Sequence, residues 1–285
     1  MMADMVATDW TQVLANEYQV PDDRSLPELT AELTRMLGDP DPEARDGVAF
    51  PVLATWVSEG VYDDLLIGLG DGMAAGLATG LGETDTDSVF RRTFSALVLG
   101  CVVERDTEER LVPGEQVLRW GDRIVGWYLR ENDLRGFVPG RGWAHAVAHG
   151  ADAIGALATS PHLTVAELTV LLDVIAERAV SAPAPLLSGE PDRMASAVLE
   201  VFRRNLVPVS EVELWLARLE EHANPFGHSD VTERDPYAST TNPQALLRAV
   251  YLQLAFGARP PADRTDLMLV TVDALRRTNP FTLKP

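Results

Sequence analysis

Helical periodicity is the feature that most constrains this chain. Apolar residues recur at intervals of three and four along almost its whole length, and no convincing stretch shows the apolar–polar alternation of a half-buried strand. Patterns that start helices interrupt this periodicity. Ser25 with Glu28, Thr164 with Glu167 and Ser210 with Glu213 all have the spacing of a capping box. The sequence therefore predicts an all-α protein of about a dozen helices.

The order of these helices favours an α-solenoid of the HEAT or armadillo type. Helices of roughly 12 to 18 residues follow one another through short capped turns, as they do in stacked helical pairs. No strict repeat occurs at the usual period of about 40 residues, so a compact irregular helical bundle remains the alternative. We expect residues 1–285 to form one all-helical domain.

One long segment lacks any period. Residues 224–241 read NPFGHSDVTERDPYASTT, and we predict a long irregular loop there, with the next helix starting at Asn242 and Pro243. A structureless segment of this length in a compact domain is usually a functional cover or a mobile excursion. It is therefore a candidate to lie over a site.

A glycine-rich run follows Tyr62. Glycines occur at positions 68, 70, 72, 76, 80 and 82, but they do not spell G-x-G-x-x-G and no β-branched strand precedes them. The run therefore predicts a helix pair packed through small residues and not a phosphate-binding loop.

The charge balance excludes one class of partner. There are 24 Lys and Arg residues against 43 Asp and Glu residues, which gives a formal net charge of −19. Such a surface repels polyanions, so we expect no binding of nucleic acid. A cationic or neutral partner, either a small molecule or a protein, fits the charge better.

Neither a membrane nor an oxidising compartment is indicated. The start MMADMVATDW lacks the basic and apolar regions of a signal peptide, and no run approaches the ~20 apolar residues that cross a bilayer. The single cysteine, Cys101, lies in an apolar run and reads as a buried inert thiol. We expect a cytoplasmic protein that does not bind membranes.

The stretch DLRGFVPGRGWAHAVAHGADAIGAL, residues 133–157, holds the candidate site. On a continuous helix His145, His149 and Asp152 would fall within about 60° of one another, so two imidazoles and a carboxylate would share one face. Three roles are open for them. They could bridge helices through hydrogen bonds, bind a divalent metal such as zinc, or line a metal-free pocket for acid–base chemistry.

Three further residues are candidates for ligand binding. Arg135 or Arg141 could hold an anion, and Trp143 could stack on a ligand. Each has a structural alternative, because Arg135 lies near acidic Glu131 and Asp133 and a tryptophan is often part of the core. Unlike H-E-x-x-H, the histidine pair has no adjacent general base, which disfavours peptidase chemistry.

The order and spacing of several segments resemble a bacterial family, domain of unknown function 2785. The resemblance is carried by D-x-R-G at Asp133 to Gly136 and by G-W-x-H-x-x-x-H-x-A-D at Gly142 to Asp152. It extends over about residues 26 to 256, and the glycine run departs from the more leucine-rich helix of the family. The resemblance implies an all-helical HEAT-like fold and a site at this signature, but no activity.

Two classes of function stay open on the sequence alone. One is a cytosolic helical-repeat protein that binds a small polar ligand or a protein partner. The other is an enzyme that uses His145, His149 and Asp152, with or without a divalent metal, on a small molecule. A fold of this kind does not choose between them, because function belongs to sites.

Overall fold

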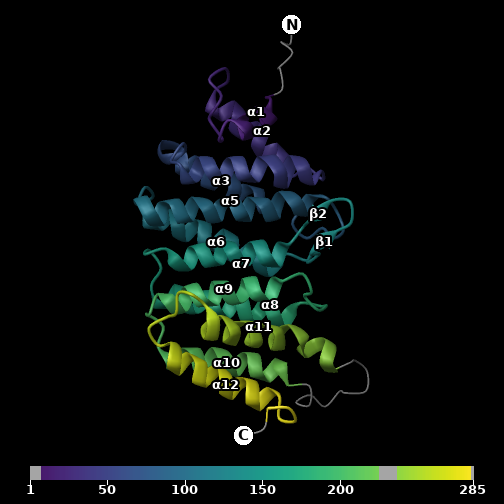
Figure 1. The fold of residues 1–285 in the computed structure, drawn as a ribbon, viewed down its shortest axis with the longest axis vertical. Coiled ribbons are helices and arrows are strands. Elements are labelled where there is room, and N and C mark those ends of the chain that lie inside the picture. The colour runs from purple at the N-terminus through teal and green to yellow at the C-terminus, as the bar shows by residue number, and fades with distance from the viewer. Residues whose placement is uncertain (1–7, 225–235, 284–285) are drawn as a thin grey trace.

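A computed structural model describes residues 8–224 and 236–283, and the regular secondary structure in these ranges is helical apart from one short β-hairpin (Figure 1). The prediction of an all-α protein is confirmed. The elements within the described ranges are α1 (Trp10–Ala15), α2 (Leu26–Met36), the π-helix η1 (Glu43–Ala49), α3 (Phe50–Ser58), the 3₁₀ turn η2 (Asp63–Leu65), α4 (Leu66–Gly76), α5 (Ser88–Glu109), α6 (Gly114–Arg130), β1 (Phe137–Val138), β2 (Gly142–Trp143), α7 (Ala146–Thr159), α8 (Val165–Ser181), α9 (Glu190–Arg203), α10 (Val209–Ala223), α11 (Pro236–Phe256) and α12 (Arg264–Thr278).

Two of the three expected capping boxes form. Ser25 and Thr164 each accept from the third backbone amide of their helix, while Glu28 and Glu167 reach back to the capping residue. The box at Ser210 is wrong, because the capping residue of α10 is Pro208, two residues earlier, and the helix begins at Val209. Proline fixes the backbone dihedral φ before a helix, and here it sets the start in place of the serine.

The region between α10 and α11 also differs from the prediction. Helix α11 begins at Pro236, so residues 236–241, expected to be part of the irregular loop 224–241, are helical. Pro243, expected at the start of this helix, lies inside it. Residues 225–235 lie outside the described residues.

A short β-hairpin interrupts the helices before α7. Phe137 pairs with Trp143 and Val138 with Gly142, in antiparallel register. Gly140 and Gly142 have φ values of 74° and 77°, in the left-handed region that glycine tolerates. Two residues per strand are too few to show an alternating pattern, so the sequence analysis missed this hairpin.

The helices stack along the long axis of the molecule, with α1 and α12 at opposite ends (Figure 1). From α3 to α11, each odd-numbered helix contacts the next odd-numbered one, and α4, α6, α8, α10 and α12 contact one another in the same successive way. Helix α7 has the most extensive contacts, with α5 on one side and α9 on the other. Every residue of α7 except Asp152 and Thr159 is buried.

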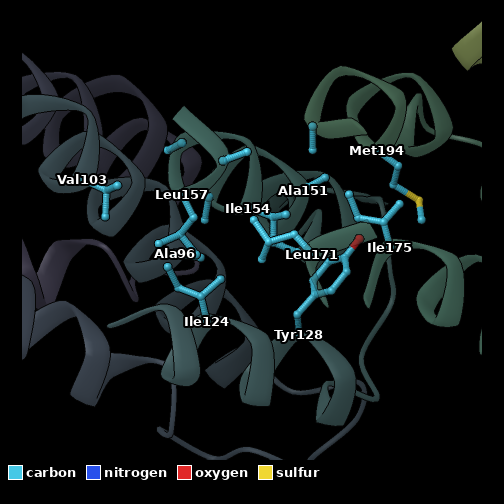
Figure 2. Packing of buried hydrophobic residues seen from close by; sticks show 14 of the residues in the cluster. Ala96, Val103, Ile124, Tyr128, Ala151, Ile154, Leu157, Leu171, Ile175 and Met194 are labelled. Atoms are coloured by element: carbon cyan, nitrogen blue, oxygen red, sulfur yellow. The ribbon is translucent and has the colours of Figure 1, made fainter. Parts of the chain in front are cut away.

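One hydrophobic core runs through this stack. It extends from Trp10 in α1 to Leu275 in α12 without a break between elements. Figure 2 shows its centre, where Ile154 and Leu157 of α7 lie among side chains from neighbouring helices, including Ile124 of α6 and Leu171 of α8. No helix within the described ranges is both long and apolar enough to cross a membrane.

The glycine run does not form the predicted helix pair: it forms the single helix α4 as far as Gly76, followed by turns in which Gly80 and Gly82 have φ values of 62° and 99°. Within α4, only some of the glycines allow close packing. A Cβ atom added at Gly70 would lie 2.3 Å from the Trp120 ring, whereas one at Gly72, two residues further along α4, would meet nothing within 4 Å. The Trp120 ring cannot move away easily, because it is buried and its Nε1 donates to Asp71 Oδ1 at 2.9 Å. Gly70 is therefore needed for close packing of α4 on α6.

This contrast gives a matched pair of variants. We expect Gly70→Ala to lower the free energy of unfolding by about 1–3 kcal/mol through overpacking. Gly72→Ala should raise it by about 0.5–1 kcal/mol, because alanine favours an exposed helix interior. Urea denaturation of both variants measures the difference. Equal effects of the two substitutions would contradict this account of α4.

Candidate functional site

His145 does not lie on the helix, which corrects the expectation of one shared helical face. It is the capping residue before α7, with φ 51° and ψ 38°, and the helix begins at Ala146. The reason is in the backbone: the amide of His145 donates to the Arg135 carbonyl at 3.0 Å, and that of Ala144 donates to the Gly136 carbonyl at 2.9 Å. These bonds hold the chain in an extended path until residue 145.

The His145 ring joins three segments. Its Nε2 lies 3.1 Å from the Ser188 carbonyl oxygen, to which it donates, and 4.0 Å from Glu190 Oε1. On one face it stacks on Trp143, with 4.3 Å between ring centroids. Burial lowers its pKa below 6.5, with Glu190 opposing the shift. A neutral ring that donates from Nε2 leaves Nδ1 as the acceptor.

His149 lies one turn into α7 and is 7% exposed. Its ring centroid is 5.6 Å from that of His145 and 5.0 Å from that of Phe94, both in edge-to-face geometry. Burial, with His145 and Arg193 nearby, holds the pKa of His149 well below 6.5. Its Nδ1 is buried without a hydrogen-bond partner among the described residues.

Asp152 is directed toward α9. Its carboxylate receives two hydrogen bonds from Arg193, one of them from Nε to Oδ1 at 2.7 Å. Burial raises the pKa of Asp152, and Arg193 opposes that shift. Within the described residues, no three His, Cys, Asp or Glu side chains are placed to hold a metal ion. The geometry therefore gives no support to zinc binding by His145, His149 and Asp152.

Arg135 belongs to a network that fixes the segment before the hairpin. Its Nε and Nη2 donate to the two oxygens of buried Asp133 at 2.7 and 2.6 Å, and Nη2 also donates to the Thr86 carbonyl. Two residues earlier, Glu131 accepts from Arg92 at 2.5 and 3.0 Å in a fully buried pair. These contacts directly support a structural role for Arg135, the local ion pair, over ligand binding.

Arg141 and Trp143 lie at the exposed hairpin. Arg141 forms an ion pair with Asp87, and both side chains are about half exposed. Trp143 is 40% exposed and contacts Phe137 edge-to-face, with 5.0 Å between centroids. The six candidate residues therefore do not form one site. His145 and His149 lie next to each other, Arg135 pairs with Asp133, Asp152 pairs with Arg193 of α9, and Arg141 and Trp143 lie at the hairpin.

The sequence analysis missed Arg45, which anchors the hairpin from the other side. This fully buried residue lies on η1 and donates to the Asp39 carbonyl at 2.8 Å and to the Arg141 carbonyl at 2.7 Å. Its guanidinium carbon is 4.0 Å from the centre of the Phe90 ring. Arg45 also forms an ion pair with its neighbour Asp46, from Nη2 to Oδ2 at 2.7 Å. No spacing in EARDG signals the other contacts, because they are made with distant backbone carbonyls and a distant aromatic ring.

A groove across α5, α7 and α9 is the second feature that the sequence did not reveal. It encloses about 630 Å³. On α7 it is lined by Asp152 and by the short, buried residues Ala151, Gly155 and Ala156. Residues of α5 and α9, the two helices that pack on α7, complete the lining. The small residues of α7 therefore contribute to the depth of the groove.

Acidic side chains outnumber basic ones along this groove. Glu104 and Glu108 of α5, Asp152 of α7 and Glu200 of α9 line it, together with Arg193 and Arg259. Burial raises the pKa of Glu104, and the carboxylates of Glu108, Asp152 and Glu200 raise it further. Within the described part of the chain, Glu104 and Glu108 have no ion-pair partner.

These features define an all-helical protein with an acidic groove across its central layer, and with two neighbouring histidines of which His149 is buried and His145 partly exposed. The chain belongs to a family described as a protein of unknown function, DUF2785, whose model matches residues 77–252, more than half of the sequence. The resemblance inferred from the sequence is thereby confirmed. Neither the curated proteins nor the solved structures gave a match.

The buried histidine predicts how stability depends on pH. Because the folded pKa of His149 is depressed, its contribution to stability is complete above 6.5 and is lost as the pH falls from 6.5 toward the folded pKa. Below 6.5 the unfolded chain binds a proton that the folded chain does not. Between pH 6.5 and 5.5 we expect His149→Gln to reduce the slope of unfolding free energy by up to about 1.4 kcal/mol per pH unit.

Urea denaturation at a series of pH values measures this slope for wild type and variant. Between pH 7.5 and 8.5 the two proteins should show the same slope, which serves as the internal control. A slope between pH 6.5 and 5.5 that His149→Gln leaves unchanged would show that His149 is protonated in the folded protein.

Proposed function

We propose that this chain is an α-solenoid of the HEAT or armadillo type that binds a positively charged partner in the α5–α7–α9 groove, in the cytoplasm. The successive contacts within the odd-numbered and even-numbered helices support the solenoid. The starts of α8 and α10, at residues 165 and 209, are 44 residues apart, within the period of roughly 40–47 residues of such repeats, whereas α6 and α8 start 51 residues apart. A compact irregular bundle is the alternative, and the all-helical structure fits it too.

The observation that supports binding is the unpaired acidic wall of the groove. Glu104 and Glu108 lie one turn apart on α5 and form no close ion pair among the described residues, although Glu108 is one of the carboxylates that raise the pKa of Arg105. Asp152 and Glu200 lie near enough to raise the pKa of Glu104. A cation placed between these carboxylates would relieve their mutual repulsion. The excess of acidic residues in the whole chain would attract such a partner from a distance.

An enzyme that uses the histidine pair has less support. His145 donates to a backbone carbonyl, His149 is enclosed against Phe94, and Asp152 is bound by Arg193. Because each of the three groups is engaged by a different neighbour, no two of them are directed at one reactant. His145 and His149 also do not line the groove. We therefore assign them to the packing that positions α7.

Isothermal titration of the full chain with a penta-lysine peptide at low ionic strength tests the binding. We expect the double variant Glu104→Gln/Glu108→Gln to lose about fivefold to tenfold in affinity, since two partly exposed ion pairs are each worth up to about 1 kcal/mol. Because the pKa of Glu104 is raised, the affinity of the wild type should begin to fall above pH 4.5 as the pH is lowered.

Glu211→Gln/Glu213→Gln is the matched control. Both residues are exposed on α10 and do not line the groove. This variant has the same net charge as the groove variant, so it corrects for general attraction of the peptide. Equal losses in the two double variants would mean that the groove is not the binding site.

Hydrogen exchange distinguishes the solenoid from the bundle. Leu219 of α10 and Leu53 of α3 are both fully buried, near opposite ends of the stack, and substitution of either by alanine should cost about 2–5 kcal/mol. In a solenoid, stability is set by neighbouring repeats. We therefore expect Leu219→Ala to speed exchange in α10–α12 and Leu53→Ala to speed it in α2–α5. Uniform acceleration in all helices by both variants would favour the bundle.

A further inference from the structure

The groove already holds an arginine of its own chain. Arg259 comes from the segment between α11 and α12, lines the groove, and donates from Nη2 to Glu200 Oε1 at 2.9 Å. The same oxygen accepts from Arg203 Nη1 at 2.7 Å. Arg259 is 75% exposed in its side chain, so it covers Glu200 from the solvent side. Glu200 would keep Arg203 as a partner if Arg259 moved away.

A second arginine shows how the groove receives a guanidinium group. Arg193 meets the carboxylate of Asp152 through both Nε and Nη2, which is the paired geometry that a planar guanidinium allows and an ammonium does not. Two of the four groove carboxylates are thus matched by arginines from within the chain. Glu104 and Glu108 are left for a group from outside.

The groove walls also suit the stem of an arginine. Leu97, which is only partly buried, offers apolar surface in the groove, where methylene groups can pack while the charged end stays near Glu104. Cys101 lies in the same wall, and burial raises the pKa of its thiol to about 12. The thiol is therefore neutral at physiological pH and adds a soft apolar contact.

We infer that the groove binds an arginine-bearing segment of a partner polypeptide, and that Arg259 is an internal competitor which this segment displaces from Glu200. The inference rests on the proposed function and names the partner's chemistry. An open groove of about 630 Å³ exceeds one arginine side chain and suits several consecutive residues. Arg259 can leave at little cost, because its ion pair is largely exposed.

The test compares three probes by isothermal titration of the full chain: penta-arginine, penta-lysine and argininamide. We expect penta-arginine to bind more tightly than penta-lysine, and argininamide to bind more weakly than penta-arginine. Arg259→Ala should tighten penta-arginine binding by about fivefold, because no internal arginine then competes with the peptide for Glu200. Arg276→Ala, which removes an exposed arginine of α12 outside the groove, should give a smaller gain.

Thermal melts of Arg259→Ala and wild type at the same pH check that the variant folds as well as the parent. Arg259→Lys is a second test, since lysine keeps the charge and loses the planar group. The affinity of this variant for penta-arginine should lie between those of the wild type and Arg259→Ala. An affinity for penta-arginine that Arg259→Ala leaves unchanged, or changes no more than Arg276→Ala does, overturns the role of Arg259.

The remaining outcomes separate this inference from the proposed function. If neither pentapeptide binds, the proposed function itself fails. If penta-lysine binds as tightly as penta-arginine, a cation site exists but it does not select guanidinium. If argininamide binds as tightly as penta-arginine, the site takes a small molecule and not a peptide segment.

Discussion

The close packing of α7 between α5 and α9 is the constraint on which the rest of this structure depends. Alanine and glycine residues on α7 let α5 and α9 approach it closely, and some of them also line the groove. The same small residues therefore create both the tight central layer and the groove. A Cβ added at Gly155 would just touch Ala197 of α9, with 3.5 Å to its Cα. A side chain longer than alanine would therefore have no room there unless α9 moved away. Packing and groove depth cannot change independently.

Local signals in the sequence were sufficient for the helices and for two of their caps. The capping boxes of Ser25 and Thr164 involve only residues up to three positions further along the chain, so the local sequence contains both partners of each hydrogen bond. The start of α7 could not be predicted in this way. His145 stays outside the helix because its amide is bound ten residues back by Arg135, and such a contact leaves no helical or alternating signature.

The candidate site shows the same division between local and distant partners. Spacing placed Asp152 near the histidines, but its carboxylate is bound by Arg193, forty-one residues further along the chain. The groove acids were not recognised, because Glu104 and Glu200 become neighbours only when α5 and α9 flank α7. Charge composition predicts a cationic or neutral partner, and this stays a prediction. It could not predict where the negative charge would be concentrated.

The π-helix η1 makes the chain intolerant of length changes at one point. Its wider turns place Arg45 so that it reaches the Asp39 and Arg141 carbonyls while Phe90 covers it. Deleting one residue from Glu43–Ala49 would let an ordinary α-helix form, and everything on one side of the deletion would rotate by about 100°. Arg45 would then point away from the hairpin. Insertions and deletions in relatives should therefore avoid this segment, even though much of it lies at the surface.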